Sequence, residues 1–365
     1  MEKLRAFLKR KNIVISGRRY GIDALGAMAQ GLFCSLLIGT IVKTVGEQTG
    51  LPFLVDVGVF ASAMSGAAMA IAIGWALNAP PLVLFSLATV GYAANELGST
   101  TLSGGRGAGG PLAVLFIAVI AAEFGKAVSK ETKVDILVTP LVTILVGVGL
   151  SALTAPAIGT AVTAVGNVIK WATNLQPFFM GIVVSVLMGM ALTLPISSAA
   201  ICTAFGLTGL AGGAAVAGCC ANMVGFAVLS FRENRWGGLV SQGIGTSMLQ
   251  MGNIVKNPRI WLPAILTSAI TGPIATCLFK LEMNGPPVSA GMGTCGLVGQ
   301  IGVWTGWLSP SETALADGAA AIAPGAFEWT GLILISFVLP AVLCWAFGLL
   351  FRRAGWIKEG DLKLD

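Results

Sequence analysis

The feature that most constrains this chain is a stretch of 61 residues, 171–231, that contains no aspartate, glutamate, lysine or arginine. A helix rises about 1.5 Å per residue, so this stretch could cross a hydrocarbon layer of about 30 Å roughly three times. Near its middle, the sequence LPISSAAICT (194–203) combines a proline with several hydroxyl side chains. Backbone that is not helical at membrane depth is tolerated only where it is buried in protein or lines a water-filled cavity. The stretch therefore predicts a membrane protein built around a polar path.

The composition supports the membrane class and excludes several kinds of chemistry. Hydrophobic residues make up 55% of the chain and charged residues only 10%, whereas soluble domains are about one-quarter charged. The net charge of +6 is typical of basic loops at a cytoplasmic membrane face, so we expect no nucleic-acid partner. The chain has no histidine, and its seven cysteines show no CxxC spacing. We therefore expect no metal site, no cofactor and no catalytic residue.

Uncharged runs and basic loops predict the topology. Five spans precede the charge-free stretch, and two follow it, at 260–279 and 329–351. The stretch itself is long enough for three spans, although one span with a re-entrant hairpin fits the topology equally well. The fold class is thus an all-α polytopic membrane protein of about ten transmembrane helices with re-entrant hairpins. Basic residues lie near both ends of the chain, so both termini are expected to be cytoplasmic. Interface anchors are expected at the tryptophans near span ends, residues 171, 236, 261, 329 and 356.

Three segments follow from this topology. Residues 1–20 form a basic segment with apolar residues at helical spacing, which predicts either an amphipathic cytoplasmic helix on the membrane surface or an unstructured basic tail. Residues 21–351 form a single transmembrane domain of the transporter type. Residues 352–365 form a basic cytoplasmic tail.

Two glycine-rich polar stretches follow spans in the two halves of the chain, at 94–111 and 282–302. Interrupted segments at corresponding places in two halves point to the binding site of a transporter. The pairing is consistent with an inverted repeat, although no residue-by-residue repeat is visible.

Glu96 is the acidic residue that most suggests a ligand contact. It ends an uncharged run, 57–95, and the neighbouring Asn95 supplies an amide. Ionisable groups inside a membrane protein are costly and are usually functional. A carboxylate beside an amide can bind two adjacent sugar hydroxyls, because one accepts hydrogen bonds and the other both donates and accepts.

Neutral polar side chains within apolar runs complete the candidate lining. Each costs free energy in lipid unless it is hydrogen-bonded, and pairing between helices would explain any one of them. Together they describe a neutral surface that matches hydroxyl groups rather than an ion path. The candidates are Ser197, Ser198, Asn222, Gln250, Asn253 and Gln300.

The motif GxGxxG occurs twice, at 105–110 and 291–296, but neither copy has the strand and helix context of a dinucleotide site. Arg106 lies inside the first copy, directly before a predicted helix, and free amides at a helix N-terminus can bind an anion. Transport of an organic anion therefore stays open as an alternative.

Several segments resemble the stand-alone IIC-type membrane components of the bacterial sugar phosphotransferase system, in particular the PfoR-like branch. They are NIVISGRRYGIDALGAMAQGLF (12–33), KVDILVTPLVT (133–143), LPISSAAI (194–201) and NPRIWLPAILTSAITGPIA (257–275). The resemblance implies about ten spans with re-entrant hairpins, a homodimer, and a carbohydrate-like ligand in the membrane domain. Better-known members use a glutamate and often a histidine near the sugar, and this chain has no histidine. The resemblance also implies a location in the bacterial inner membrane, and transport coupled to phosphorylation would need separate soluble IIA and IIB phosphoryl carriers as partners.

The sequence therefore favours a permease that binds a small polar solute, a sugar or polyol, and moves it by alternating access. Two alternatives stay open: a membrane sensor that regulates gene expression through a partner, and the organic-anion transporter. The candidate ligand-binding residues are Asn95, Glu96, Ser197, Ser198, Asn222, Gln250, Asn253 and Gln300.

The substitution Glu96→Gln tests the acidic part of this prediction. It keeps the size of the side chain but removes the charge, so solute binding should weaken while the protein stays folded. A thermal-shift assay with a panel of sugars and polyols measures the effect. Unchanged affinity would remove Glu96 from the site.

Overall fold

The computed structural model describes residues 2–364, and the side chains of residues 6–364. Within that range the chain is helical, and its β-structure is limited to isolated bridges. Contacts divide the chain into two compact units, unit 1 (Met1–Thr163) and unit 2 (Ala164–Asp365). The boundary falls inside one long helix, α8 (Asp135–Ala172). The all-α prediction is therefore confirmed.

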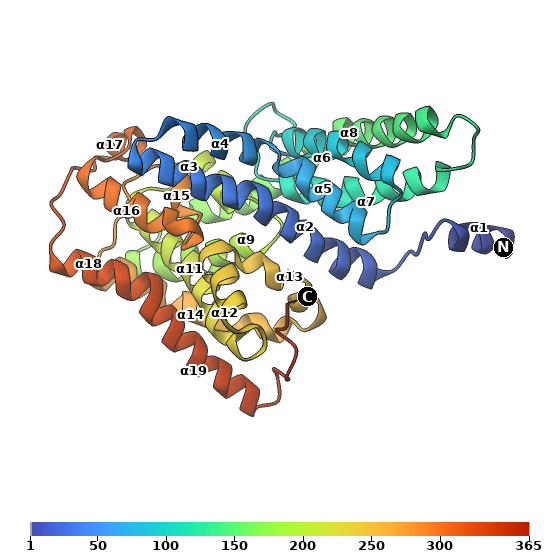
Figure 1. Ribbon diagram of the computed structural model, residues 1–365. Coiled ribbons are helices and arrows are strands. Elements are labelled where there is room, and N and C mark those ends of the chain that lie inside the picture. The colour runs from blue at the N-terminus through green and yellow to red at the C-terminus, as the bar shows by residue number, and fades with distance from the viewer. Residues whose placement is uncertain (1, 365) are drawn as a thin grey trace. The chain divides into compact units, whose positions relative to one another are not determined.

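Unit 1 is built from the first seven helices and most of α8 (Figure 1). The first candidate span, Arg19–Thr49, is one continuous helix that contains two π-helical turns. The helices are α1 (Glu2–Arg10), α2 (Ala24–Leu32), α3 (Ile38–Thr49), α4 (Pro52–Ala63), α5 (Ser65–Ala76), α6 (Pro81–Gly98) and α7 (Gly110–Val128).

The N-terminal basic segment forms a helix, and its end is tied to the loop after α7. Arg10 Nη2 lies 2.7 Å and Lys11 Nζ 2.5 Å from the carboxylate of Glu131. The hydrogen bond from Lys11, with the nearby charge of Arg10, holds the pKa of Glu131 below its usual range. This contact is therefore retained at neutral pH and is lost only as the pH falls through that lowered pKa.

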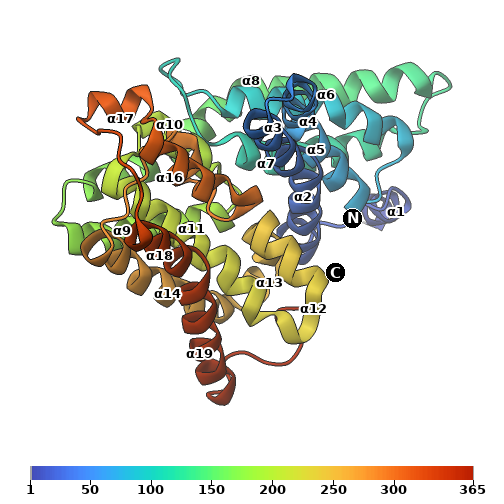
Figure 2. The same ribbon diagram turned by 60° about the vertical axis from the view of Figure 1, so that its left-hand side comes forward.

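Unit 2 surrounds one buried helix, α11 (Gly209–Leu229). In its most hydrophobic window 89% of the residues are buried, compared with 22% for α8. The helices α9 (Pro177–Thr193), α14 (Leu262–Pro273) and α19 (Leu339–Arg353) pack against it. Figures 1 and 2 show α18 (Ala326–Ile333) and α19 as one long helical element.

Short helical pieces fill the rest of unit 2, and they interrupt the longer helices. They are α10 (Ser198–Phe205), α12 (Phe231–Val240), α13 (Met251–Lys256), α15 (Pro287–Ala290), α16 (Val298–Leu308) and α17 (Glu312–Ala316). Shorter turns join them: η3 (Ser241–Gly245), η4 (Ser247–Gln250), η5 (Pro258–Trp261), η6 (Ile274–Leu278), η7 (Cys295–Leu297) and η8 (Leu334–Val338).

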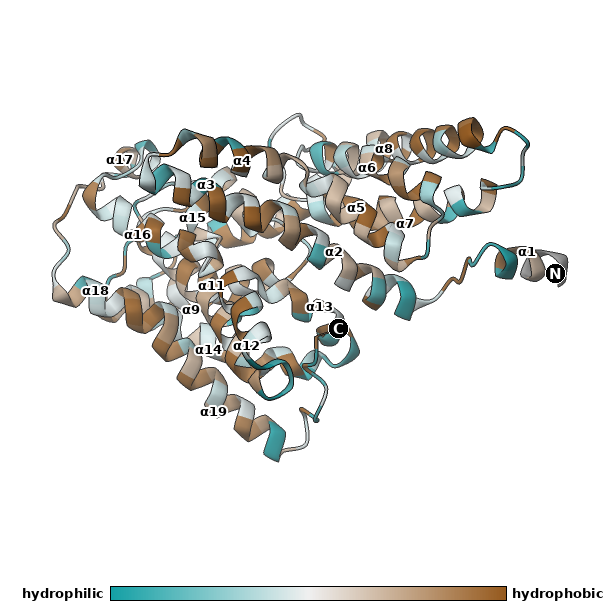
Figure 3. Cartoon of the chain, in the orientation of Figure 1, coloured by the Kyte–Doolittle hydropathy of each residue, from teal (hydrophilic) through white to brown (hydrophobic). Residues whose placement is uncertain are grey.

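Within the described residues, six helices are long and apolar enough to cross a membrane, and the bent pair α4–α5 makes a seventh candidate. Figure 3 shows the hydrophobic residues continuing along α8 and along α18–α19. Ten spans were predicted. The other three expected crossings correspond to α6, α9 and α10, with 18, 17 and 8 residues. Ten spans and an inverted repeat therefore stay predictions, as do the segment boundaries at 20/21 and 351/352.

The helix α8 extends beyond the point at which its internal prolines would usually end a helix. The helix α8 continues through Pro140 and Pro156 for 38 residues. A proline removes one backbone hydrogen bond and usually kinks or ends a helix, but in membrane helices the freed groups can be satisfied again locally.

Glycines allow the helices of unit 2 to pack at backbone contact. A Cβ atom added to Gly218 of α11 would lie 1.8 Å from the Ser185 carbonyl oxygen of α9. A Cβ atom on Gly272 of α14 would lie 2.0 Å from the Gly181 carbonyl oxygen, also on α9. Small residues at such contacts are how membrane helices gain close packing.

The substitution Gly218→Ala should destabilise unit 2, because the added methyl group overlaps the α9 backbone. Overpacking of this kind costs about 1–3 kcal/mol. Thermal unfolding of the purified protein in detergent measures it. Gly149→Ala is the matched control, since nothing lies within 4 Å of a Cβ atom at that helical position. Equal melting temperatures for the two variants would contradict the close packing.

Candidate functional site

Two interrupted segments that are far apart in the sequence meet in unit 2. The first leads from α9 through α10 to α11, and the second lies between η6 and α16. Gly209 and Met283 exchange two backbone hydrogen bonds, of 3.1 and 3.0 Å. Ser198 Oγ donates to the Gly291 carbonyl oxygen at 2.7 Å. The junction of 194–209 with 281–300, called here the broken-segment junction, is the candidate site.

Local sequence explains why the first segment breaks where it does. Pro195 follows the end of α9, and Ser197 caps the next helix by accepting a hydrogen bond from the Ala200 amide at 3.2 Å. The short helix then ends at Gly206, whose φ of 60° lies in the left-handed region. The predicted break is confirmed, and Ser197 acts as its helix cap.

The second segment breaks at a pair of prolines and at three residues with left-handed backbone. Pro286 and Pro287 begin the single turn α15. Gly293, Gly296 and Leu297 then have φ values of 53°, 52° and 61°. Two of these three positions are glycine, which adopts this conformation at little cost.

Two glycines of the second segment have no room for a side chain. A Cβ atom on Gly291 would lie 2.6 Å from the Ser198 carbonyl carbon, and one on Gly293 would lie 2.7 Å from the Cys219 Cβ atom. The glycine spacing noted in the sequence therefore serves close approach to α10 and α11.

Asn222 lies at the centre of a polar network on the buried helix α11. Its Nδ2 donates to the Gly218 carbonyl oxygen and to Ser268 Oγ, both at 3.2 Å. Its Oδ1 accepts from Trp261 Nε1 at 2.9 Å and from Thr193 Oγ1 at 3.2 Å. An amide side chain has two donors and one oxygen with two lone pairs, so Asn222 is saturated within the protein. This arrangement joins α9, α11 and α14 and leaves Asn222 no free group.

Gln300 on α16 is different. Its Nε2 donates to Cys220 Sγ at 3.3 Å, while its Oε1 is buried without a hydrogen-bond partner among the described residues. A buried acceptor without a partner costs about 1–3 kcal/mol and calls for an explanation. Ser336 lies beside the same thiol, and its Oγ is also buried without a partner. Ser336 belongs to the π-helical turn η8, a feature often found at functional sites.

Including Gln300 and Ser336, the residues of unit 2 whose buried side-chain oxygen lacks a hydrogen-bond partner among the described residues are Glu233, Asn284, Gln300 and Ser336. The sequence analysis did not select Asn284 or Ser336. Asn284 lies within the broken stretch 282–302, so a search of that stretch for amides could have found it. Ser336 is one hydroxyl in an apolar helix and gives no sequence signal.

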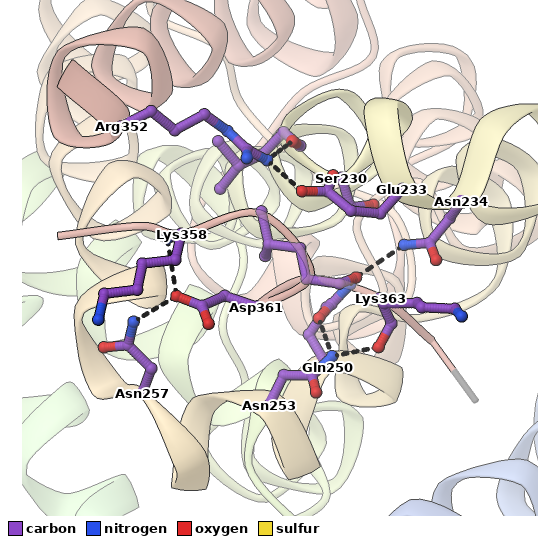
Figure 4. Close-up of polar contacts among 12 residues, drawn as sticks. Ser230, Glu233, Asn234, Gln250, Asn253, Asn257, Arg352, Lys358, Asp361 and Lys363 are labelled. Carbon is purple, nitrogen blue, oxygen red and sulfur yellow. Dashed lines mark hydrogen bonds and ion pairs between the residues drawn. The ribbon is translucent and has the colours of Figure 1, made fainter. Parts of the chain in front are cut away.

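Gln250 and Asn253 bind the C-terminal tail of the chain (Figure 4). Gln250 Nε2 donates to the Leu362 carbonyl oxygen at 2.9 Å, and Asn253 Nδ2 donates to the Lys363 carbonyl oxygen at 2.8 Å. The two amides also bond to each other at 2.9 Å. Gln242 extends the chain of amides by accepting from Gln250 at 2.9 Å.

Two further asparagines bind the same tail. Asn234 Nδ2 donates to the Leu362 carbonyl oxygen and its Oδ1 accepts from the Leu364 amide, both at 2.8 Å. Asn257 Nδ2 donates to the Trp356 carbonyl oxygen at 3.0 Å and to Asp361 Oδ2 at 2.8 Å. Leu362 is fully buried beneath this set of contacts. The tail therefore holds α12 and α13 together.

Asn95 and Glu96 lie near the end of α6 in unit 1, whereas the other six candidates lie in unit 2. Asn95 packs against two glycines: a Cβ atom on Gly66 would lie 2.6 Å from Asn95 Cβ, and one on Gly110 would lie 2.6 Å from Asn95 Oδ1. Glu96 is exposed in unit 1. A shared lining of all eight residues stays a prediction.

Interrupted helices meeting inside a helical multi-pass protein are typical of membrane transporters. A comparison with protein families agrees with this class. The model of the family described as Phosphotransferase system, EIIC, matches residues 22–364. The chain therefore belongs to this family, the membrane components of the phosphotransferase system, whose general function is sugar transport.

No significant match was found among curated proteins or among solved structures. The PfoR-like branch, the homodimer and the solute stay predictions.

The substitution Leu362→Ala tests the contact between the tail and the amides. Removing a fully buried leucine side chain costs about 2–5 kcal/mol. Because the tail binds through few elements, we expect α12 and α13 to lose protection in hydrogen exchange before α11 does. Lys363→Ala is the control, since its side chain is exposed and its bonding carbonyl group is retained. Uniform loss of protection across unit 2 would contradict a separable tail.

Proposed function

We propose that the chain binds a small, neutral, polyhydroxylated solute, a sugar or polyol, and moves it across the membrane by alternating access. The observation that carries this proposal is the unpartnered carbonyl oxygen of Gln300. Gln300 lies on α16 at the edge of the broken-segment junction, and no described residue bonds to this oxygen, whereas a solute hydroxyl is a donor that would satisfy it. Ser198 and Ser336 add hydroxyl groups in the same unit.

The buried polar groups of unit 2 favour a neutral solute over an ion. Among its described residues, every polar residue that is buried as a whole is serine, threonine, asparagine or glutamine. The carboxylate of Glu233, whose side chain is also buried, is paired with Arg352. Such side chains both donate and accept, as a sugar hydroxyl does. An ion path would require charged side chains at these positions.

Contacts at one end of unit 2 support the proposal that the C-terminus is cytoplasmic. Arg352 at the end of α19 donates to the Leu229 carbonyl oxygen at the end of α11, at 3.2 Å. Asn234 of α12 binds the tail that follows α19. The basic residues after α11 and after α19 are therefore at the same end of the unit, which the positive-inside rule would make cytoplasmic.

This basic end is also where a separate phosphoryl carrier would dock. The family belongs to a phosphotransferase system. A carrier that modifies the solute must approach from the cytoplasm, and negatively charged surfaces are attracted to exposed lysine and arginine. Coupling to a soluble partner is thus part of the proposal.

The substitution Gln300→Leu separates binding from stability. It removes a buried oxygen without a partner, so the melting temperature should stay the same or rise. Binding of the preferred solute should weaken about tenfold, the equivalent of about 1.4 kcal/mol, because one hydrogen bond to the solute is lost. A panel of hexoses, polyols and carboxylates in a thermal-shift assay, followed by calorimetry, measures both quantities.

Thr305→Val on the same helix is the control, since Thr305 donates to the Ile301 carbonyl oxygen within the helix. A fall in melting temperature with unchanged affinity would assign Gln300 a purely structural role. If the protein bound carboxylates more tightly than every sugar and polyol tested, the solute would be an organic anion and the proposed solute class would be wrong.

A further inference from the structure

We propose that unit 2 carries a binding site for one anionic phospholipid, in a groove between α12 and the last two turns of α19. The acyl chain would occupy the apolar groove, and the phosphate group would bind Arg232. This site is separate from the broken-segment junction and does not depend on the nature of the transported solute.

The groove has a volume of about 350 Å³, and its lining is mainly apolar. Trp345, Leu349 and Arg352 line it from α19. Their positions i, i+4 and i+7 place them on one face of the helix. Trp236 and Leu239 line it from α12.

The groove keeps its shape because α19 packs closely on the end of α11. A Cβ atom on Gly348 would lie 2.2 Å from Leu229 Cδ1, so this glycine lets the two helices approach. Arg352 ties the same helix ends together through the Leu229 carbonyl oxygen and through Glu233, at 3.2 and 2.8 Å.

The charges of the groove favour an anionic headgroup. Arg352 is already paired with Glu233, whose side chain is only 5% exposed. Arg232 also lines the groove, and it makes no hydrogen bond or ion pair with the described residues. An arginine presents a planar set of donors that matches two phosphate oxygens. The groove therefore combines an apolar interior with one free cation at its edge.

The position of the groove favours a lipid as the source of the phosphate. It lies at the ends of two candidate spans, Gly209–Leu229 and Ala326–Arg353, where headgroups meet the hydrocarbon layer. Trp236 and Trp345 are 71% and 55% exposed, and tryptophan is enriched at this depth of a membrane. Basic pockets between membrane helices bind anionic headgroups.

A second copy of the chain is a less favourable occupant. A two-fold contact centred on this groove would bring the same surface of each copy together. Two Arg232 side chains would then be added to one small interface. Glu233, which follows Arg232 in the sequence, is already paired with Arg352. Like charges facing each other across an interface oppose association.

Native mass spectrometry of the full chain, delipidated in detergent, tests the site. The probes are phosphatidylglycerol, which is anionic, phosphatidylcholine, which is zwitterionic, and inorganic phosphate. The wild type should bind phosphatidylglycerol in preference to phosphatidylcholine. Arg232→Gln should weaken binding of phosphatidylglycerol about fivefold, which corresponds to about 1 kcal/mol for one arginine, and change phosphatidylcholine little.

Two further variants keep the test decisive. Arg353→Gln removes the same charge from the end of α19 at a residue that does not line the groove, so it should bind lipid as the wild type does. Leu239→Trp fills the groove and should weaken both lipids while Arg232 is retained. Equal phosphatidylglycerol binding by the wild type and Arg232→Gln would overturn the proposal.

Two other outcomes would show that something other than a phospholipid occupies the groove. Full competition by inorganic phosphate would show that the groove takes a free anion rather than a lipid. Loss of a dimer in Leu239→Trp, without loss of bound lipid, would show that a second copy covers the groove.

Discussion

Backbone groups that leave a helix inside a membrane must be hydrogen-bonded within the protein, and unit 2 is arranged around this requirement. The reciprocal bonds between Gly209 and Met283 satisfy two interrupted segments at once. Ser198 satisfies the Gly291 carbonyl oxygen in the same way. These contacts need backbones at close range, so glycine lies where the segments touch. The position of Gln300 follows from this packing, because α16 begins directly after the second interrupted segment.

The sequence predicted those parts of the fold that depend on local chemistry. The charge-free stretch forms α9, α10 and α11, and the break falls at Pro195 as expected. Prediction was limited where the outcome depends on length or on neighbours. A proline inside a helix usually kinks or ends it, whereas α8 continues past Pro156. The helices α6, α9 and α10 are shorter or less apolar than an ordinary span, so the number of crossings could not be settled from hydropathy alone.

Prediction of the site was limited for another reason. Composition indicated that buried amides and hydroxyls would be present, but their availability depends on partners distant in the sequence. Asn222 has four partners and no free group. Gln250 and Asn253 bind carbonyl groups 112 and 110 residues away. Gln300 looked no different from them in the sequence, and only its surroundings show an unused acceptor.

The π-helical turn η8, between α18 and α19, has a consequence for the direction of side chains. A π turn holds one more residue than an α turn, and one residue of an α-helix corresponds to a rotation of about 100°. The chain therefore enters α19 with its angular phase shifted relative to α18. Trp329, which lies before the turn, stacks edge-on against Trp307, whereas Trp345, after the turn, lines the groove beside α12. The one additional residue in the π turn thus lets a single continuous helix contact Trp307 before the turn and line the groove beside α12 after it.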